Sequence, residues 1–203
     1  MGGWPPRAVV GVGGGAGMGR GLVEHALGGD DSTMLVLVDR DSVAGALRDL
    51  EPGGEVVRVE VVDGVPRLLD RGGPMTLPDS DVAVCLAVPP TALANVCRWL
   101  LPLLPADAPI LHVAPRLVPA LEQLRELAPD HPVLGAHPLF DSTARDLDGQ
   151  TVLVVPGEPD DTSWFVDRIV AGGGIARFVT AEDHDRTMSY VQTMAHQTLL
   201  NLV

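Results

Sequence analysis

Histidines are the residues of this chain whose type and position could most directly support chemistry. His112 and His137 each end an apolar stretch that is typical of a β-strand, and Pro138 follows the second of them. In open α/β sheets, ligands bind beyond the carboxyl ends of the strands. We therefore predict that both histidines point toward one site, where an imidazole can give or take a proton.

A glycine cluster lies between a predicted strand, Ala8 to Val12, and a predicted helix, residues 18–27. A dinucleotide-binding turn needs three small residues at positions i, i+2 and i+5 in this setting. Gly14, Ala16 and Gly19 meet that spacing, with Ala where the backbone approaches the pyrophosphate. The alternative is a glycine-rich turn in a fold that has lost its nucleotide. The residues that we predict to hold the pyrophosphate are Gly14, Gly15, Ala16, Gly17, Met18 and Gly19.

An acidic residue follows the second predicted strand. Asp39 lies twenty residues beyond Gly19, where a carboxylate accepts hydrogen bonds from ribose hydroxyls and repels a 2′-phosphate. We therefore favour NAD as the cofactor. Arg40 stands next to Asp39 and keeps NADP as the alternative.

The last segment of the chain is predicted to be one long helix. Thr180 and Asp183 form a start that resembles a capping box, and no Gly or Pro follows as far as Val203. Its polar residues include His184, Gln192 and His196, which with Met188 recur at intervals of four and form a stripe. This stripe suggests the wall of a site, although spacing alone also fits two surface histidines.

An apolar face on the same segment runs to the end of the chain. Val191, Ala195, Thr198 and Leu202 share this face. No later segment of the sequence can cover it, so it packs either on the preceding domain or on another subunit.

Strand-like and helix-like stretches alternate along the chain, which predicts a doubly wound, mostly parallel sheet of the Rossmann type. Aromatic residues are only 3% of the sequence, so Val, Leu and Ala must fill the core. We expect one dinucleotide-binding domain over residues 1–179 and a further helical segment over 180–203. The predicted strands are Ala8 to Val12, Met34 to Asp39, Glu55 to Val61, Val82 to Val88, Ile110 to Val113, Val133 to Ala136, Thr151 to Val155 and Ile175 to Val179. The remaining predicted helices are residues 91–101, 119–127 and 164–171.

Charge and composition exclude several classes of function. The formal net charge of −13 argues against nucleic acid as a partner. All 14 basic residues are Arg, so neither a Schiff-base lysine nor a lysine general base is available. No apolar run reaches the length of a membrane span, and we expect a cytoplasmic protein. Cys85 and Cys97 are expected to be reduced and buried, and no ligand spacing predicts a metal site.

Several motifs together resemble those of prephenate dehydrogenases, the NAD-dependent enzymes of tyrosine biosynthesis. The resemblance extends over essentially the whole chain. The two segments near the end also have the spacing of that family. The segments that carry the resemblance are Gly14-x-Ala16-x-Met18-Gly19, Val88-Pro89, Gly135-Ala136-His137-Pro138-Leu139-Phe140, Leu147-Asp148-Gly149-Gln150, Glu182-Asp183-His184-Asp185 and Val191-Gln192-Thr193-Met194-Ala195-His196.

This resemblance implies roles for particular residues. In the family, hydride leaves the ring carbon that bears the hydroxyl, and loss of carbon dioxide aromatises the ring. His137 would accept the hydroxyl proton, which a neutral imidazole with a pKa near 6.5 can do. His196 would line the pocket for a cyclohexadiene substrate, supported by Gln192 and His184, and Val88 with Pro89 would adjoin the cofactor. The family also implies a homodimer through the C-terminal helix, here the first helix of a truncated helical domain.

Departures from the family pattern leave the function open. The family has D-x-x-S-x-K after the fifth strand, where this chain has His112-Val113-Ala114-Pro115-Arg116-Leu117. Arg116, Arg145 or Arg186 could hold substrate carboxylates in place of the missing groups. On the resemblance, we expect the chain to be a prephenate or arogenate dehydrogenase. The alternatives are a dehydrogenase for another chorismate-derived ring, such as 4-amino-4-deoxyprephenate, and a non-catalytic protein that keeps the fold.

Overall fold

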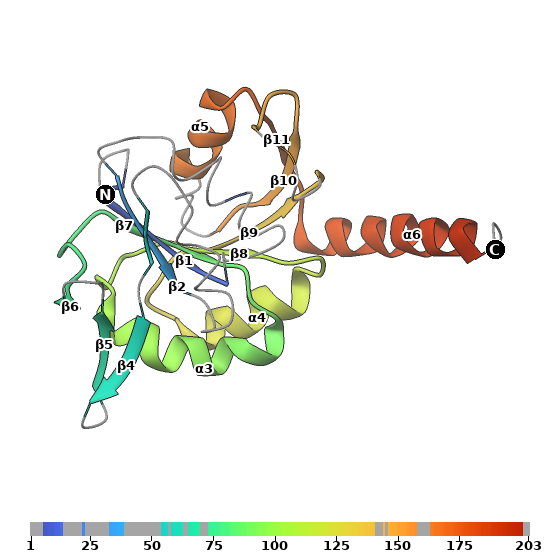
Figure 1. Ribbon diagram of the computed structural model, residues 1–203. Helices are drawn as coiled ribbons and strands as arrows, with labels where there is room; N and C mark the ends of the chain where they lie inside the picture. Colours follow the sequence, from blue (N-terminus) through green and yellow to red (C-terminus); the bar gives the residue numbers. More distant parts are fainter. Residues whose placement is uncertain are drawn as a thin grey trace.

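The computed structural model in Figure 1 describes residues 6–13, 22, 33–38, 54–56, 58–62, 65–69, 73–140, 144, 146–157 and 163–200. The glycine-rich turn at 14–19 and the pair Asp39 and Arg40 lie outside these residues. Of the side chains on the last helix, those of residues 192, 193 and 195–200 are also outside the described part.

An eight-stranded sheet forms the centre of the molecule, in the order β11-β10-β9-β8-β7-β1-β2-β3. Neighbouring strands run parallel except β9 and β10, which are antiparallel. β1 lies between β2 and β7, so the strand order reverses there, as in doubly wound dinucleotide-binding folds. The predicted fold class is confirmed. The strands are β1 (Ala8–Val12), β2 (Met34–Val38), β3 (Gly54–Val56), β7 (Val82–Leu86), β8 (Ile110–Val113), β9 (Val133–Pro138), β10 (Thr151–Val155) and β11 (Ile175–Phe178).

Helices cover both faces of this sheet. α3 (Pro90–Leu100) and α4 (Val118–Leu127) pack their leucines on one face, in one core with side chains of β7 and β8. α5 (Ser163–Ala171) buries Phe165 and Ile169 on the other face. A short 3₁₀ helix, Leu101–Leu103, follows α3. The core is filled largely by Val, Leu and Ala, as the low aromatic content predicts.

One predicted strand is wrong. The stretch from Glu55 to Val61 divides between β3 in the large sheet and β4 (Arg58–Val62) in a separate antiparallel sheet with β5 (Val65–Leu69) and β6 (Pro74–Met75). A continuous apolar pattern does not show where a chain leaves one sheet for another. The sequence does carry a signal for the β4–β5 pairing, because the two residues between these strands are Asp-Gly, a common two-residue hairpin loop.

The last helix, α6 (Ala181–Leu200), extends away from the rest of the molecule (Figure 1). Thr180 caps it, since its hydroxyl oxygen accepts the backbone N–H of Asp183 at 3.0 Å. Among its described side chains, the buried ones are Ala181, His184 and Met188, which dock its first two turns. The long helix predicted from the sequence is therefore confirmed as far as Leu200, and its beginning is fixed to the sheet.

Two further properties concern the described residues as a set. Cys85 and Cys97 are free and buried, as expected, and burial raises the pKa of Cys85 to about 12. Among the described residues, no helix combines the length and the apolar character that a membrane span needs.

Gly13 lies where β1 leaves the sheet, and it requires glycine for two reasons. Its φ of 77° is in the left-handed region, which costs other residues roughly 1–2 kcal/mol. A Cβ at this position would also lie 2.5 Å from the carbonyl oxygen of Ala87 and 2.8 Å from a methyl group of Val88. The end of β1 and the segment after β7 are therefore in close backbone contact at the start of the glycine-rich turn.

We expect Gly13→Ala to lower the free energy of unfolding by about 3 kcal/mol, because the strained φ and the crowding add together. Gly149→Ala is the matched control: its φ is 67°, but its Cβ would meet nothing within 4 Å. That variant should lose only the conformational part, about 1 kcal/mol. Urea unfolding measures both, and equal losses would mean that the contact with Ala87 is unimportant.

Candidate functional site

The carboxyl ends of β1, β7, β8 and β9 meet at one edge of the sheet. In the pairing of β8 with β9, His112 lies opposite Gly135. His137 follows Gly135 by two residues, so both histidines are on the same face, which α4 covers. A Cβ on Gly135 would be 3.1 Å from Leu117 and from Leu121 of α4. The small residue therefore allows close packing of α4 beside the two histidines.

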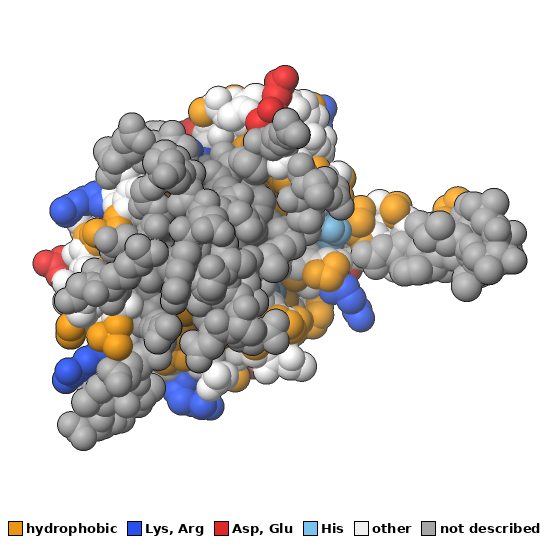
Figure 2. Space-filling view, in the orientation of Figure 1, with side chains coloured by type: hydrophobic (Ala, Val, Ile, Leu, Met, Phe, Trp, Pro, Cys, Tyr) orange, Lys and Arg blue, Asp and Glu red, His pale blue; other side chains and the backbone are white. Residues whose placement is uncertain are grey.

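His137, His184 and Asp185 form a chain of hydrogen bonds at this edge. Nδ1 of His137 lies 2.8 Å from Nε2 of His184, and Nδ1 of His184 lies 2.8 Å from Oδ1 of Asp185. The two rings meet edge to face, with centroids 5.0 Å apart. His184 is buried, with only 1% of its surface exposed, whereas His137 is half-buried. In Figure 2, histidine surface is visible where α6 joins the body of the protein.

Asp185 also caps α4. Its Oδ1 accepts the backbone N–H of Leu117 at 2.7 Å, and its Oδ2 accepts that of Val118 at 3.1 Å. α4 has no cap from its own N-terminal residue, so the carboxylate satisfies N–H groups that would otherwise lack partners. Burial alone raises the pKa of Asp185. The hydrogen bonds from Leu117, His184 and Val118 outweigh that effect, and the pKa lies below its usual range.

The surroundings of His137 keep its imidazole neutral at neutral pH. Burial is the main influence and lowers the pKa of His137, and the adjacent His184 lowers it further. Asp185 acts in the opposite direction, because a negative charge favours the imidazolium. The result is a neutral, partly accessible imidazole at the carboxyl edge of the sheet, which can accept a proton and pass part of the charge toward a carboxylate.

His112 is a second buried histidine, but it is not part of this chain. Its Nδ1 donates to the carbonyl oxygen of Leu86 at 2.9 Å, whereas Nε2 has no partner among the described residues. Burial lowers the pKa of His112 to about 4. This residue is therefore neutral and cannot supply a negative charge at the end of β8.

The other predicted site residues are outside this hydrogen-bonded chain, and the structure describes only some of them. Val88 is half-buried against the end of β1, and Pro89 is the residue that precedes α3. Arg116 is exposed beside the N-terminus of α4. Gln192 and His196 lie on α6, and their side chains are outside the described part, as are the whole of the predicted pyrophosphate turn and the pair Asp39 and Arg40.

Asp185 is the residue of this cluster that the sequence analysis did not select. It appeared there only as the last member of Glu182-Asp183-His184-Asp185. A carboxylate near the N-terminus of a helix is usually explained by its own helix, but Asp185 caps a different one, α4, by bonding to a residue 68 positions earlier in the chain. The distance in sequence hid the interaction.

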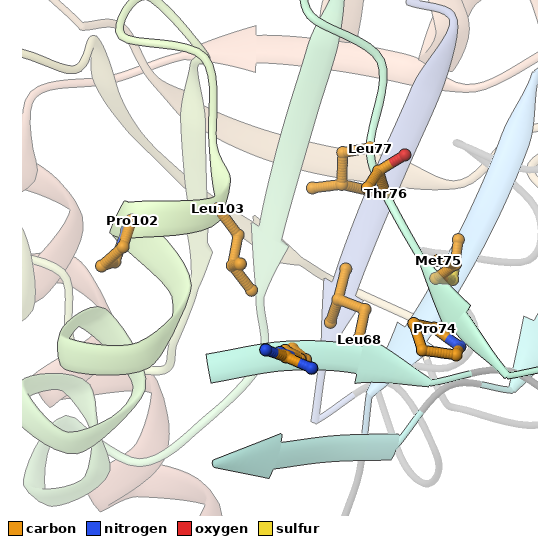
Figure 3. A pocket seen from close by; sticks show the side chains of 8 residues that line it. Leu68, Pro74, Met75, Thr76, Leu77, Pro102 and Leu103 are labelled. Atoms are coloured by element: carbon orange, nitrogen blue, oxygen red, sulfur yellow. The ribbon is translucent and has the colours of Figure 1, made fainter. Parts of the chain in front are cut away.

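A cavity of about 430 Å³ lies elsewhere, beside β5, β6 and the segment 101–103. Figure 3 shows Leu68, Met75, Leu77 and Leu103 around it. In Figure 1 these strands are on the side of the molecule away from α6, so the cavity is not part of the histidine site. Among the residues that the structure describes, no three His, Cys, Asp or Glu side chains gather as a metal site would require.

The chain is similar to known proteins in sequence and in fold. No family model matches it. T-protein from Enterobacter agglomerans is 29% identical over 118 residues, which are 58% of this chain and 31% of T-protein. The chain thus spans less than a third of that relative. Prephenate dehydrogenase from Aquifex aeolicus has the same fold, with a TM-score of 0.67 and 18% identity over 96% of this chain and 69% of its own.

The chain therefore resembles prephenate dehydrogenases in fold. A second structure of the Aquifex enzyme is a complex with hydroxyphenyl propionate and NAD⁺. Arogenate dehydrogenase from Synechocystis is also similar, with a TM-score of 0.64 and 17% identity over 91% of this chain and 63% of its own. The fold recurs in a reductive aminase from Aspergillus terreus in complex with NADPH, with a TM-score of 0.63 and 12% identity over 97% and 63% of the two chains.

The buried His112 should make the stability of the protein depend on pH. The unfolded chain binds a proton at His112 near pH 6.5 and the folded chain only near pH 4. The free energy of unfolding is therefore unaffected by His112 above pH 6.5. It falls by about 3 kcal/mol as the pH drops toward 4, because the unfolded chain then binds a proton that the folded chain does not. His112→Asn keeps a donor for Leu86 and removes the titration, so its stability should fall less over this range. Urea unfolding at several pH values measures this, and parallel curves for the two proteins would contradict it.

Proposed function

We propose that this protein is an NAD-dependent oxidoreductase that converts prephenate or arogenate to a 4-hydroxyphenyl product by oxidative decarboxylation. The observation that carries the proposal is His137, a neutral imidazole at the carboxyl edge of a dinucleotide-type sheet, hydrogen-bonded to His184 and through it to Asp185. The similarity to T-protein and to dehydrogenases of this fold supports the same reaction class.

The residues present fit a dinucleotide. Gly13 has a positive φ, and its missing side chain leaves room for the end of β1 to meet the segment after β7, at the point where the strand order reverses. Backbone N–H groups at such a turn bind phosphate. The pyrophosphate would be held by residues 14–19, with Val88 and Pro89 beside the cofactor. When bound, NAD supplies the acceptor for hydride from the ring carbon that bears the hydroxyl.

NAD is the cofactor that we propose, with Asp39 accepting hydrogen bonds from the adenosine ribose. The complex of the Aquifex enzyme contains NAD⁺, which agrees with this choice. NADP is the alternative, because Arg40 adjoins Asp39 and a protein of the same fold is seen with NADPH.

In the proposed reaction, His137 accepts the proton of the ring hydroxyl while the adjacent carbon is oxidised, and loss of carbon dioxide then gives an aromatic ring. His196, Gln192 and Arg116 form part of the substrate pocket. His184 has a different place from the one expected of a pocket wall, because it is buried behind His137 and hydrogen-bonded to it.

A second candidate substrate is another chorismate-derived ring, such as 4-amino-4-deoxyprephenate. The observation that favours it is the end of β8 and the segment that follows, where His112 and Pro115 stand in place of an acid and a serine of the prephenate dehydrogenase pattern. His112 is neutral and buried, and Pro115 has no N–H or hydroxyl to offer. The non-catalytic alternative predicts that none of these substrates is converted.

We also propose that two copies of the chain associate through α6, which would begin a helical domain at residue 180. The helix extends from the body (Figure 1), and beyond its docked turns it exposes Tyr190, Val191 and Met194 at 68%, 52% and 70%. A stripe of large apolar side chains on a projecting helix is typical of an interface. We place the enzyme in the cytoplasm.

If the dimer forms, Met194→Asp should shift the protein toward the monomer, since a charge in an apolar contact is costly. Ser189→Asp adds the same charge on the opposite side of α6 and should leave the association unchanged. Sedimentation equilibrium at tens of micromolar measures the mass. A monomeric unmutated chain, or equal effects of the two variants, would contradict this interface.

His137→Asn should lower kcat on the best of the three substrates by roughly 10²–10⁴-fold, which is the usual contribution of a general base. The affinity for NAD should barely change, because His137 contacts the ring of the substrate. His131→Asn is the control. His131 lies in the loop before β9 and is hydrogen-bonded to the carbonyl oxygen of Ala108, so this variant should keep a normal kcat. A fully active His137→Asn variant would remove this residue from the mechanism.

A further inference from the structure

The hydrogen bonds around Asp185 determine where the protons of both histidines lie. The carboxylate is ionised at neutral pH, since its pKa is lowered, and an ionised carboxylate only accepts hydrogen bonds. Oδ1 lies 2.8 Å from Nδ1 of His184. The proton of that bond must therefore belong to His184, on Nδ1.

The next bond in the chain follows from the first. When His184 is neutral and carries its proton on Nδ1, its Nε2 has a lone pair and can only accept. Nε2 lies 2.8 Å from Nδ1 of His137, so His137 must donate through Nδ1. Its other nitrogen, Nε2, is then left without a proton. A free histidine side chain prefers the Nε2–H tautomer, so the surroundings hold His137 in the less common one.

We propose that His184 and Asp185 are positioning residues that fix His137 as the Nδ1–H tautomer and leave Nε2 as the atom that accepts a proton. This inference rests on the function proposed above and adds the atom and the two residues that prepare it. The carboxylate is itself held in place by the backbone N–H groups of Leu117 and Val118. The direction of every hydrogen bond in the chain is thus set by the main chain of α4.

The same chain accounts for the proton after transfer. Nε2 of His137 takes one proton from the ring hydroxyl, and the resulting positive charge is shared with His184 through the 2.8 Å bond. Asp185, at the far end, offsets that charge without taking up a proton itself. Of the other described groups at this edge, His112 is neutral, and Arg116 beside α4 is exposed and positive.

The tautomers can be read by NMR without any turnover. In protein labelled with ¹⁵N-histidine, ¹H–¹⁵N correlation spectra at neutral pH distinguish a protonated from an unprotonated ring nitrogen. We expect His137 and His184 both to be Nδ1–H. His131 serves as an internal reference, because its Nδ1 faces the carbonyl oxygen of Ala108 at 2.9 Å and must carry the proton. An Nε2–H tautomer for His137 in the unmutated protein would overturn the proposal.

Variants of His184 test whether this residue sets the tautomer of His137. His184→Leu removes the acceptor, so His137 should change to the Nε2–H tautomer. His184→Gln can place a carbonyl oxygen near the former Nε2 and should restore Nδ1–H. If His137 keeps Nδ1–H in a folded His184→Leu variant, His184 does not set the tautomer and the proposal is wrong. If that variant does not fold, the unmutated and His184→Gln spectra decide the question.

A variant of Asp185 tests whether its negative charge favours proton binding by His137. Asp185→Asn should make His137 bind a proton about tenfold more weakly, because the carboxylate that favours the imidazolium is lost. Asp183→Asn is the matched control, two residues earlier on α6, where the exposed carboxylate pairs with Arg186. An NMR titration measures both, and equal effects would overturn the assignment to Asp185. Since no step needs substrate, failure here is distinct from failure of the proposed reaction, which only the turnover of the His137→Asn variant tests.

Discussion

The carboxylate of Asp185 is the group on which the rest of the site depends. It caps the N-terminus of α4 and it accepts the hydrogen bond of His184, so one side chain joins a helix that covers the sheet to the helix that leaves it. Among the described side chains of α6, Ala181, His184 and Met188 are buried. The apolar contact of Ala181 and Met188 alone would hold the start of this helix weakly. Charge-assisted hydrogen bonds to the backbone add direction to that contact, and the histidine pair takes its geometry from it.

His112 and His184 are both buried, and they show how burial has different consequences in different surroundings. His112 has one hydrogen bond among the described residues, to Leu86, and burial dominates, so its pKa falls to about 4. His184 is equally buried but has a carboxylate on one side and an imidazole on the other. Burying a polar ring costs free energy unless its nitrogens are bonded. Both nitrogens of His184 are satisfied, whereas His112 has only one partner among the described residues, which separates a linked residue of the site from a neutral neighbour.

Much of the fold could be predicted from the sequence, because alternating apolar stretches report a buried parallel sheet directly. The helices α3, α4, α5 and α6 begin within about a residue of their predicted positions, a precision that helix boundaries allow. The separate sheet of β4, β5 and β6 was missed, since local periodicity cannot tell which sheet a strand joins. The position of His137 at a strand end was also foreseen. The role of Asp185 was not predicted. It arises from a contact between residues 68 apart in the chain, and local sequence patterns do not report such contacts.

The departures of this chain from the family pattern and the contacts of His137 are consistent with each other. Where the prephenate dehydrogenase pattern has an acid and a serine, this chain has His112 and Pro115. His112 is neutral and hydrogen-bonded to Leu86, and Pro115 has no N–H or hydroxyl to donate. The groups that do contact His137 come from α6 instead. The orientation that we propose for His137 comes from a docked helix, so it depends on that helix staying in place. Whatever holds α6, including a second copy of the chain on its exposed stripe, would then also stabilise the geometry of the base.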